Sequence, residues 1–238
     1  MWFAHVLPTL SLGVNMNGTS DIDGMQLQFA AESTGGMIGI AALSMPQSPF
    51  HSGALSSAGG IIATLLRDSP DFGPLLNAGL KANSGGLAVP GSSVYDSFFR
   101  DAQTAIDAGD PINYVAAAVA HTPILFQRVI GGGTLPDGTA SAPDQVIPSH
   151  ASLALVTAAN FTRFGTPGTA PLPAASAAYV NFLFGHHGNI FGPDPSTVTA
   201  NTLPSWIAVT REMQSEVVGF AVAYGQAVTI TNGSLVQP

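Results

Sequence analysis

The segment "MQLQFAAESTGGMIGIAAL" (residues 25–43) passes from one type of secondary structure to another with almost no loop. Residues 25–31 are a short apolar run of the kind that forms a buried strand. Residues 34–43 are small and apolar, and they predict a helix that starts immediately afterwards. Only a sharp turn at Ser33 can join the two, and its neighbours must be small because strand and helix pass very close to each other.

The rest of the chain alternates strand and helix patterns in the same way. Apolar runs predict strands at residues 53–57, 122–130 and 177–185, and a short edge strand at "AVTIT" near the end. Helical patterns occupy much of residues 61–108. A last helix over residues 203–224 has an apolar stripe of Trp206, Val209, Met213, Val217, Phe220 or Ala221, and Tyr224. This alternation predicts a single α/β domain over residues 1–238, with a mostly parallel sheet flanked by helices.

Composition limits the partners of the chain. Only 8% of its residues are charged, and 14 acidic residues outnumber 6 lysines and arginines. The absence of a basic cluster argues against nucleic acid or an anionic membrane surface. The chain has no cysteine, which excludes disulfides and thiolate metal sites. No apolar run reaches the roughly 18–20 residues of a membrane span. The N-terminus lacks the pattern of a signal peptide, as it would in a processed or truncated precursor.

Three polar residues each follow a predicted strand, in the order serine, aspartate, histidine. They are Ser33, Asp144 and His187. Because parallel strands end at the same edge of a sheet, we expect these side chains to converge. A serine hydroxyl needs an imidazole to remove its proton, and the imidazole needs a carboxylate to fix its tautomer. The pattern predicts a catalytic triad in the chain order of α/β-hydrolases, with the backbone N–H of Thr34 directed at the oxyanion.

Each of these residues also has a plainer interpretation. A serine before two glycines is common in ordinary loops, and Asp144 in "PDQVIP" is compatible with a turn that it caps. His186 and His187 are compatible with a surface position or a metal site, but no third ligand has a suitable spacing. The partial calcium-loop pattern at residues 20–24 is excluded by its early glycine and by Met25. The joint occurrence at strand ends favours the triad, without metal or cofactor.

Six longer segments carry a more specific pattern. They are "ESTGGMIG", "LLRDSPDFGPLL", "FFRDAQTAIDAGDPINY", "SAPDQVIP", "HHGNIF" and "TREMQSEVVGFAVAYGQAVTITN". From about Asp21 onward the chain resembles bacterial extracellular α/β-hydrolases of the virulence-factor lipase and surface lysophospholipase type. The resemblance implies hydrolysis of carboxylic esters, with Ser33 as nucleophile, Asp144 as acid and His187 as base. It also implies a secreted or cell-surface bacterial protein, and it makes His186 a neighbour that shapes the loop.

Two features depart from that family. Its members usually carry Gly-His-Ser-Leu-Gly at the nucleophile, whereas this chain has Ala-Glu-Ser-Thr-Gly, which places the carboxylate of Glu32 beside Ser33. The similarity also begins just before the first strand, so the fold is predicted to be a truncated α/β-hydrolase. We expect the free edge of this strand to pair with another chain in a homo-oligomer, or to be covered by the first 20 residues.

The helical region at residues 61–114 is predicted to be a cap over the site. Candidates for substrate binding are Glu32, Leu65, Leu66, Phe72, Leu76, Phe98 and His186. A plain core role is the alternative for the apolar ones. The leading hypothesis is a serine esterase or lipase-like hydrolase that acts on a small ester, a lipid or a polyester. The alternative is a non-catalytic, hydrolase-like remnant that serves in binding or assembly.

Overall fold

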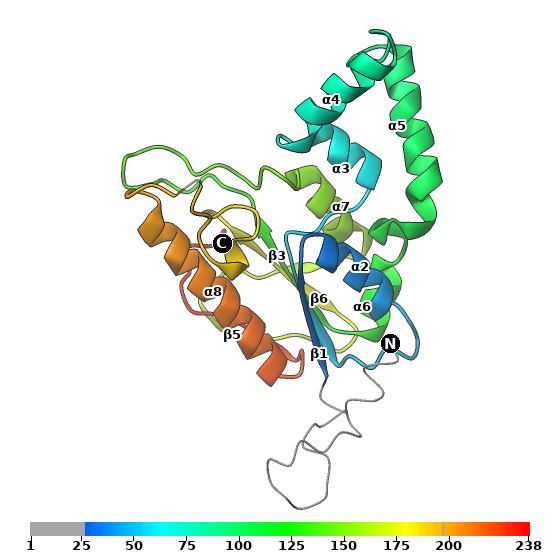
Figure 1. The fold of residues 1–238 in the computed structure, drawn as a ribbon. Coiled ribbons are helices and arrows are strands. Elements are labelled where there is room, and N and C mark those ends of the chain that lie inside the picture. The colour runs from blue at the N-terminus through cyan, green and yellow to red at the C-terminus, as the bar shows by residue number, and fades with distance from the viewer. Residues whose placement is uncertain (1–26, 197) are drawn as a thin grey trace, which may run out of the picture.

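The computed structural model describes residues 27–196 and 198–238, and a five-stranded sheet lies at its centre (Figure 1). The strands follow the order β1-β2-β3-β6-β4, and every neighbouring pair is parallel. They are β1 (Gln28–Glu32), β2 (Ser52–Ser56), β3 (Ile124–Val129), β6 (Ala177–Phe182) and β4 (Thr162–Arg163). The predicted α/β architecture with a parallel sheet is therefore confirmed.

Helices cover both faces of this sheet (Figure 1). One face packs against α8 (Leu203–Val222), and the other against α2 (Thr34–Leu43), α6 (Val115–His121) and α7 (Ser149–Ala158). Successive strand residues point to opposite faces. Leu125 of β3 therefore lies in the core beneath α8, and Phe126 lies in the core beneath α2 and α6. Burial of both faces explains why the central strands are almost continuously apolar.

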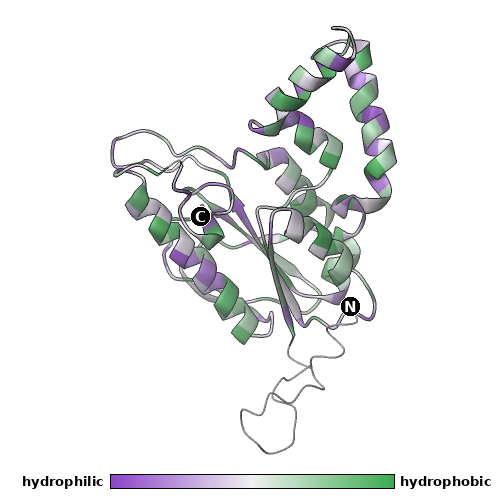
Figure 2. Ribbon diagram, in the orientation of Figure 1, coloured by the Kyte–Doolittle hydropathy of each residue, from purple (hydrophilic) through white to green (hydrophobic). Residues whose placement is uncertain are grey.

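The last helix, α8, follows the predicted apolar stripe with one correction. Its buried apolar residues are Trp206, Val209, Met213 and Phe220. Figure 2 shows the mixture of apolar and polar residues along α8 and along α5 (Ser93–Ile106), which is typical of helices with one buried face. The stripe excludes Tyr224, because the helix ends at Val222 and Tyr224 adopts a left-handed φ of 51°.

Two helices lie in segments for which the sequence predicts a loop or nothing. Helix α6 (VAAAVAH) is apolar on nearly every side, and α7 mixes small, polar and apolar residues, so neither shows an amphipathic pattern. Distant residues hold α7 in place. The guanidinium of Arg128 on β3 donates to the Ser149 carbonyl (2.9 Å) and to the Ser152 hydroxyl (2.8 Å). Tertiary contacts of this kind override weak local propensity, so the local sequence pattern does not reveal α7.

The final predicted strand is β7 (Ala227–Ile230), but it does not extend the main sheet. It pairs in antiparallel fashion with β5 (Gly168–Pro171) in a separate two-stranded sheet. The predicted short strand at this position is therefore present, and its partner β5 was not predicted from the sequence.

The region around residues 61–114 is helical, as predicted. It contains α3 (Ile62–Asp68), α4 (Phe72–Asn83) and α5, followed by short 3-10 turns at Asp107–Gly109 and Pro111–Asn113. Figure 1 shows α3, α4 and α5 projecting from the body of the molecule, and we call them the helical arm. The arm has a small core of its own around Ala63, Tyr95 and Phe99.

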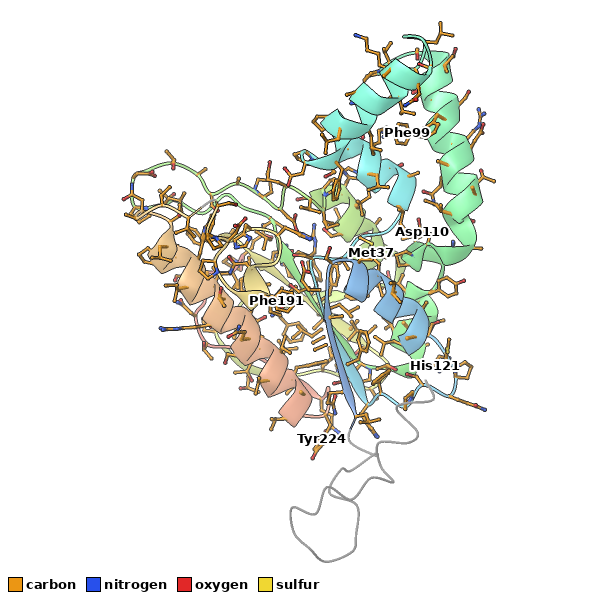
Figure 3. The ribbon with its side chains drawn as sticks, in the orientation of Figure 1. Met37, Phe99, Asp110, His121, Phe191 and Tyr224 are labelled. Carbon is orange, nitrogen blue, oxygen red and sulfur yellow. The ribbon has the colours of Figure 1, made fainter. Side chains whose placement is uncertain are left out.

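A buried carboxylate, that of Asp110, ties the two ends of the helical arm together where the arm meets the body (Figure 3). Asp110 is fully buried and accepts hydrogen bonds from the backbone N–H groups of Ile61 (3.0 Å), Ile62 (2.7 Å) and Ile112 (3.0 Å). Its second oxygen also accepts from the side-chain amide of Gln103 on α5 (2.9 Å). Asp110 thus holds both ends of the arm.

Strand β1 forms one edge of the sheet. Among residues 27–196 and 198–238, no strand pairs with the side of β1 that faces away from β2. The first 20 residues, which are predicted to cover this edge, lie outside the described residues, as do Asp21 and Met25. Within the same described ranges, no helix is long and apolar enough to cross a membrane.

Candidate active site

Ser33 lies at the sharp turn between β1 and α2. Its φ of 54° and ψ of −126° belong to a region that residues other than glycine rarely adopt. Its backbone N–H donates to the carbonyl of Ser56, the last residue of β2 (2.9 Å). This hydrogen bond ties the strained turn to the neighbouring strand, so the Ser33 side chain is held at the edge of the sheet.

The residues around the turn are small because strand and helix pass close to each other. A Cβ added at Gly36 would lie 3.0 Å from the Cβ of Ala58, which is tighter than ordinary contact. A Cβ added at Gly35 would lie 3.5 Å from that of Ala31, so alanine at position 31 fits this turn. The N–H of Thr34 opens α2, where the first N–H groups have no partner within the helix. It is available to an oxyanion at the positive end of the helix dipole.

The structure brings Ser33, His187 and Asp144 together in one hydrogen-bonded chain. His187 Nε2 lies 2.8 Å from Ser33 Oγ, and His187 Nδ1 lies 2.9 Å from Asp144 Oδ2. A carboxylate only accepts hydrogen bonds, so Nδ1 carries the ring proton, and Nε2 of the neutral ring accepts from the serine hydroxyl. In this tautomer the imidazole is ready to receive the hydroxyl proton of Ser33.

The topology of the sheet explains this convergence. Ser33 follows β1, the Asp144 loop follows β3, and His187 follows β6, so all three lie at the same edge of a parallel sheet. The N–H of Asp144 donates to Val129, the last residue of β3 (3.1 Å). Its Oδ1 accepts from the N–H groups of Val146 (2.8 Å) and Ile147 (2.9 Å), leaving Oδ2 for the imidazole. The predicted meeting of the three residues is confirmed.

A second carboxylate lies on the other side of the same imidazole. Glu32 Oε1 lies 3.3 Å from His187 Nε2, and the Glu32 side chain is only 12% exposed. Oε1 is buried and lies within ion-pair distance of Nε2. It makes no hydrogen bond, because Nε2 of the neutral ring faces Ser33 Oγ and has no proton to donate to Glu32. The sequence places Glu32 beside the nucleophile, but its contact with His187 was not predicted.

The pKa values of Glu32 and His187 are both raised. Burial raises the pKa of Glu32, and the charge of Asp144 adds to this, while attraction to His187 and a hydrogen bond from the Gly188 N–H oppose it. Burial on its own lowers the pKa of His187. The hydrogen bond to Asp144 and the charges of Asp144, Glu32 and Asp71 outweigh burial, so the pKa of His187 lies above its ordinary value.

His186 organises the loop that carries His187. The backbone N–H of Asp194 donates to His186 Nε2 (2.8 Å), so the ring proton is on Nδ1, which donates to the His187 carbonyl. The His186 ring also packs against Trp206 of α8, with 4.8 Å between ring centroids. This arrangement fits the prediction that His186 shapes the loop.

A small pocket of about 280 Å³ opens beside the imidazole. It is lined by Asp71, Gln145, Val146, His186, His187 and Asp194. Asp71 was not predicted as a site residue, although it lies immediately before α4, where a polar side chain is available to the site. A larger pocket of about 770 Å³ lies at the opposite edge of the sheet, where its lining includes His121 and Tyr224 (Figure 3). Its lining contains no aspartate or glutamate and includes none of Ser33, Asp144 and His187.

The apolar candidates for substrate binding separate into two groups. Leu65 is 2% exposed and packs with Ile147, and Leu66 is partly buried in the same cluster, which agrees with the alternative of a plain core role. Phe72 is 41% exposed and Phe98 is 44% exposed on the helical arm. Phe98 stacks edge-on against Phe99, with centroids 5.2 Å apart, and a role for Phe72 and Phe98 in binding stays a prediction.

Comparison with known proteins adds no assignment. No protein-family model matches the chain, and no curated protein matches its sequence. In the described part of the chain, no three His, Cys, Asp or Glu side chains are grouped as a metal site. What this site can do chemically is therefore argued from its residues and their geometry.

Proposed function

We propose that this protein is a serine hydrolase of carboxylic esters, of the esterase or lipase type. One observation carries the proposal. Ser33 sits on a strained strand-to-helix turn, and its hydroxyl and Asp144 bond to the two nitrogens of His187 at 2.8 and 2.9 Å. The resemblance to extracellular α/β-hydrolases points to the same ester chemistry and to a secreted or surface-exposed bacterial protein.

The residues define roles for each step of an acyl-serine mechanism. Ser33 Oγ attacks the ester carbonyl carbon while His187 Nε2 takes the hydroxyl proton, and Asp144 stabilises the imidazolium. The negative charge that develops on the carbonyl oxygen is met by the Thr34 N–H. The imidazolium then protonates the departing alcohol, which leaves an acyl-serine. Water attacks this ester by the same route and gives its proton to His187. The imidazolium then returns a proton to Ser33 Oγ as the acyl–oxygen bond breaks, which releases the acid and restores the resting enzyme.

The substrate is proposed to lie between the sheet edge and the helical arm. Within this proposal, the fold is a truncated α/β-hydrolase and the arm is its cap. Phe72 and Phe98 are exposed on the arm and offer apolar surface to an acyl or aromatic group. Within this proposal these two rings border the site, and exposed aromatic rings there suit a solid polyester as well as a lipid. Comparing acid release from a solid polyester and from a triglyceride distinguishes these substrates.

The test of the proposal is Ser33→Ala with a matched control. Ser57 directly follows β2, is buried and has a φ of 48°, so Ser57→Ala also removes a hydroxyl from a left-handed position at the next strand end. We expect Ser33→Ala to lower kcat/KM for a short p-nitrophenyl ester by about a thousandfold or more, and Ser57→Ala to retain most of the activity. Equal turnover by Ser33→Ala and the unmodified protein would refute the proposal.

The alternative is a hydrolase-like scaffold that serves in binding or assembly. Within the described part of the chain β1 is an edge strand, and this favours the alternative, because a strand edge is a template for pairing with another chain. The same edge supports the proposal of a homo-oligomer. Light scattering tests assembly, and a monodisperse monomer contradicts it. Assembly without any reaction at Ser33 would favour the scaffold over the enzyme.

A further inference from the structure

The catalytic imidazole lies between two carboxylates rather than one. Asp144 binds Nδ1 at 2.9 Å, and Glu32 Oε1 lies 3.3 Å from Nε2. Oε1 of Glu32 is buried and makes no hydrogen bond in the described structure. A buried carboxylate oxygen without a partner is costly, so its position beside the nitrogen that receives the serine proton requires a physical explanation.

The charges around this imidazole are predominantly negative. Glu32 faces it from the end of β1, Asp144 from the loop after β3, and Asp71 from the start of α4. The loop after β6 contributes Asp194, which lines the same pocket, and His186, whose Nε2 accepts a hydrogen bond from the Asp194 N–H. No Lys or Arg is among the groups that line the pocket or influence the titration of His187. An imidazolium is therefore favoured here.

We propose that Glu32 is a positioning residue that acts through His187, by stabilising the imidazolium that forms when Ser33 attacks the ester. This inference rests on the proposed function. When Nε2 receives the serine proton, the ring becomes a cation with one carboxylate on each side. The Glu32 carboxylate then faces a positively charged ring, whereas before attack it faced a neutral one. Its contact with His187 is therefore stronger in the transition state than before attack.

The same contact has a cost for the resting enzyme. Glu32 also favours the protonated ring before attack, and protonated His187 cannot take the proton of Ser33. The active form therefore requires a higher pH than it would without Glu32. Because the two groups lie close together, the acidic limb of the pH profile reports the coupled pair rather than either residue alone.

The experiment compares the full-length protein with Glu32→Gln, Glu32→Asp and Asp101→Asn. Asp101 carries a surface carboxylate that is 69% exposed, so its variant controls for the loss of one negative charge. The His187 ring is followed by ¹⁵N-histidine NMR across pH, and kcat/KM for a neutral p-nitrophenyl ester is measured over the same range. The NMR titration reports the contact whether or not the protein turns over ester.

We expect Glu32→Gln to move the His187 titration and the acidic limb to lower pH by about one unit or more. Its plateau activity at high pH falls by about tenfold, because the imidazolium loses a partner. Glu32→Asp shifts the titration less, and Asp101→Asn does not shift it. If Glu32→Gln does not fold, Glu32→Asp decides the question, since a titration that matches the unmodified protein overturns the inference.

The outcomes separate this inference from the proposed function. An unchanged His187 titration and plateau in Glu32→Gln overturn the role of Glu32, even if ester hydrolysis is intact. No hydrolysis by the unmodified protein refutes the proposed function and, with it, the role of Glu32 in attack. In that case a shifted His187 titration still establishes the electrostatic contact as a property of the site.

Discussion

A buried glutamate on α8 makes the stability of this fold depend on pH. Glu216 of α8 is fully buried, and its Oε2 accepts a hydrogen bond from Gln127 on β3 (2.8 Å). Its Oε1 has no hydrogen-bond partner. Burial raises the pKa of Glu216 well above its ordinary value, the charge of Glu212 adds to this, and the Gln127 hydrogen bond only partly opposes it.

The sign of the effect follows from the protons bound. Above the ordinary pKa of a glutamate, the unfolded chain has lost this proton while folded Glu216 keeps it. Folding then takes up a proton, so the free energy of unfolding falls as pH rises. The decrease is at most about 1.4 kcal/mol for each pH unit, and it stops at the folded-state pKa. Glu216→Gln removes this contribution and keeps an oxygen that accepts from Gln127.

Urea unfolding at several pH values between about 5 and 8 measures this difference. Trp206 on the same helix is 8% exposed and reports unfolding by fluorescence. We expect the stability of Glu216→Gln relative to the unmodified protein to rise with pH until the folded-state pKa of Glu216 is reached and to stay level above it. Asp101→Asn, which removes an exposed carboxylate, is the control for the loss of one negative charge. Parallel pH dependence of Glu216→Gln and the unmodified protein would refute the argument.

Two further substitutions test how the arm and the turn are held. Asp110→Asn removes a charged acceptor from buried N–H donors, so we expect a loss of about 3 kcal/mol and faster hydrogen exchange at Ile61 and Ile62. Unchanged exchange contradicts the anchoring role. Gly36→Val is expected to cost about 1–3 kcal/mol through overpacking against Ala58 and to lower ester hydrolysis at least tenfold. Gly35→Ala, which meets only ordinary contact, is the matched control, and equal effects of the two variants contradict the close approach.

The sequence contained enough to predict the parallel sheet and the three residues that meet at its edge. Buried parallel strands have nearly continuous apolar runs, and β3 and β6 could therefore be recognised without their neighbours. Ser33 and His187 stand out because each closely follows such a run, and Asp144 lies in the loop that follows β3. Their order along the chain, serine then aspartate then histidine, is the order of the α/β-hydrolase triad and therefore pointed to hydrolase chemistry.

What the sequence could not predict depends on contacts between distant residues. Helix α7 is held by Arg128, and the pairing of β7 with β5 joins two short segments of weak pattern. The contact of Glu32 with His187 requires the turn after β1 and the loop after β6 to be placed together first. Glu216 had a usable signal, because its spacing places it on the buried stripe of α8. A charged residue at such a position is ordinarily assigned to solvent.

The central claim is that His187 and Asp144 activate Ser33. Covalent labelling by a fluorophosphonate probe tests it most directly, because only an activated serine reacts at an appreciable rate. Peptide mapping by mass spectrometry after labelling is predicted to find the probe on Ser33 alone, and Ser33→Ala is predicted to remain unlabelled. A folded protein that does not react, or one that carries the probe at another serine such as Ser57, would contradict the account.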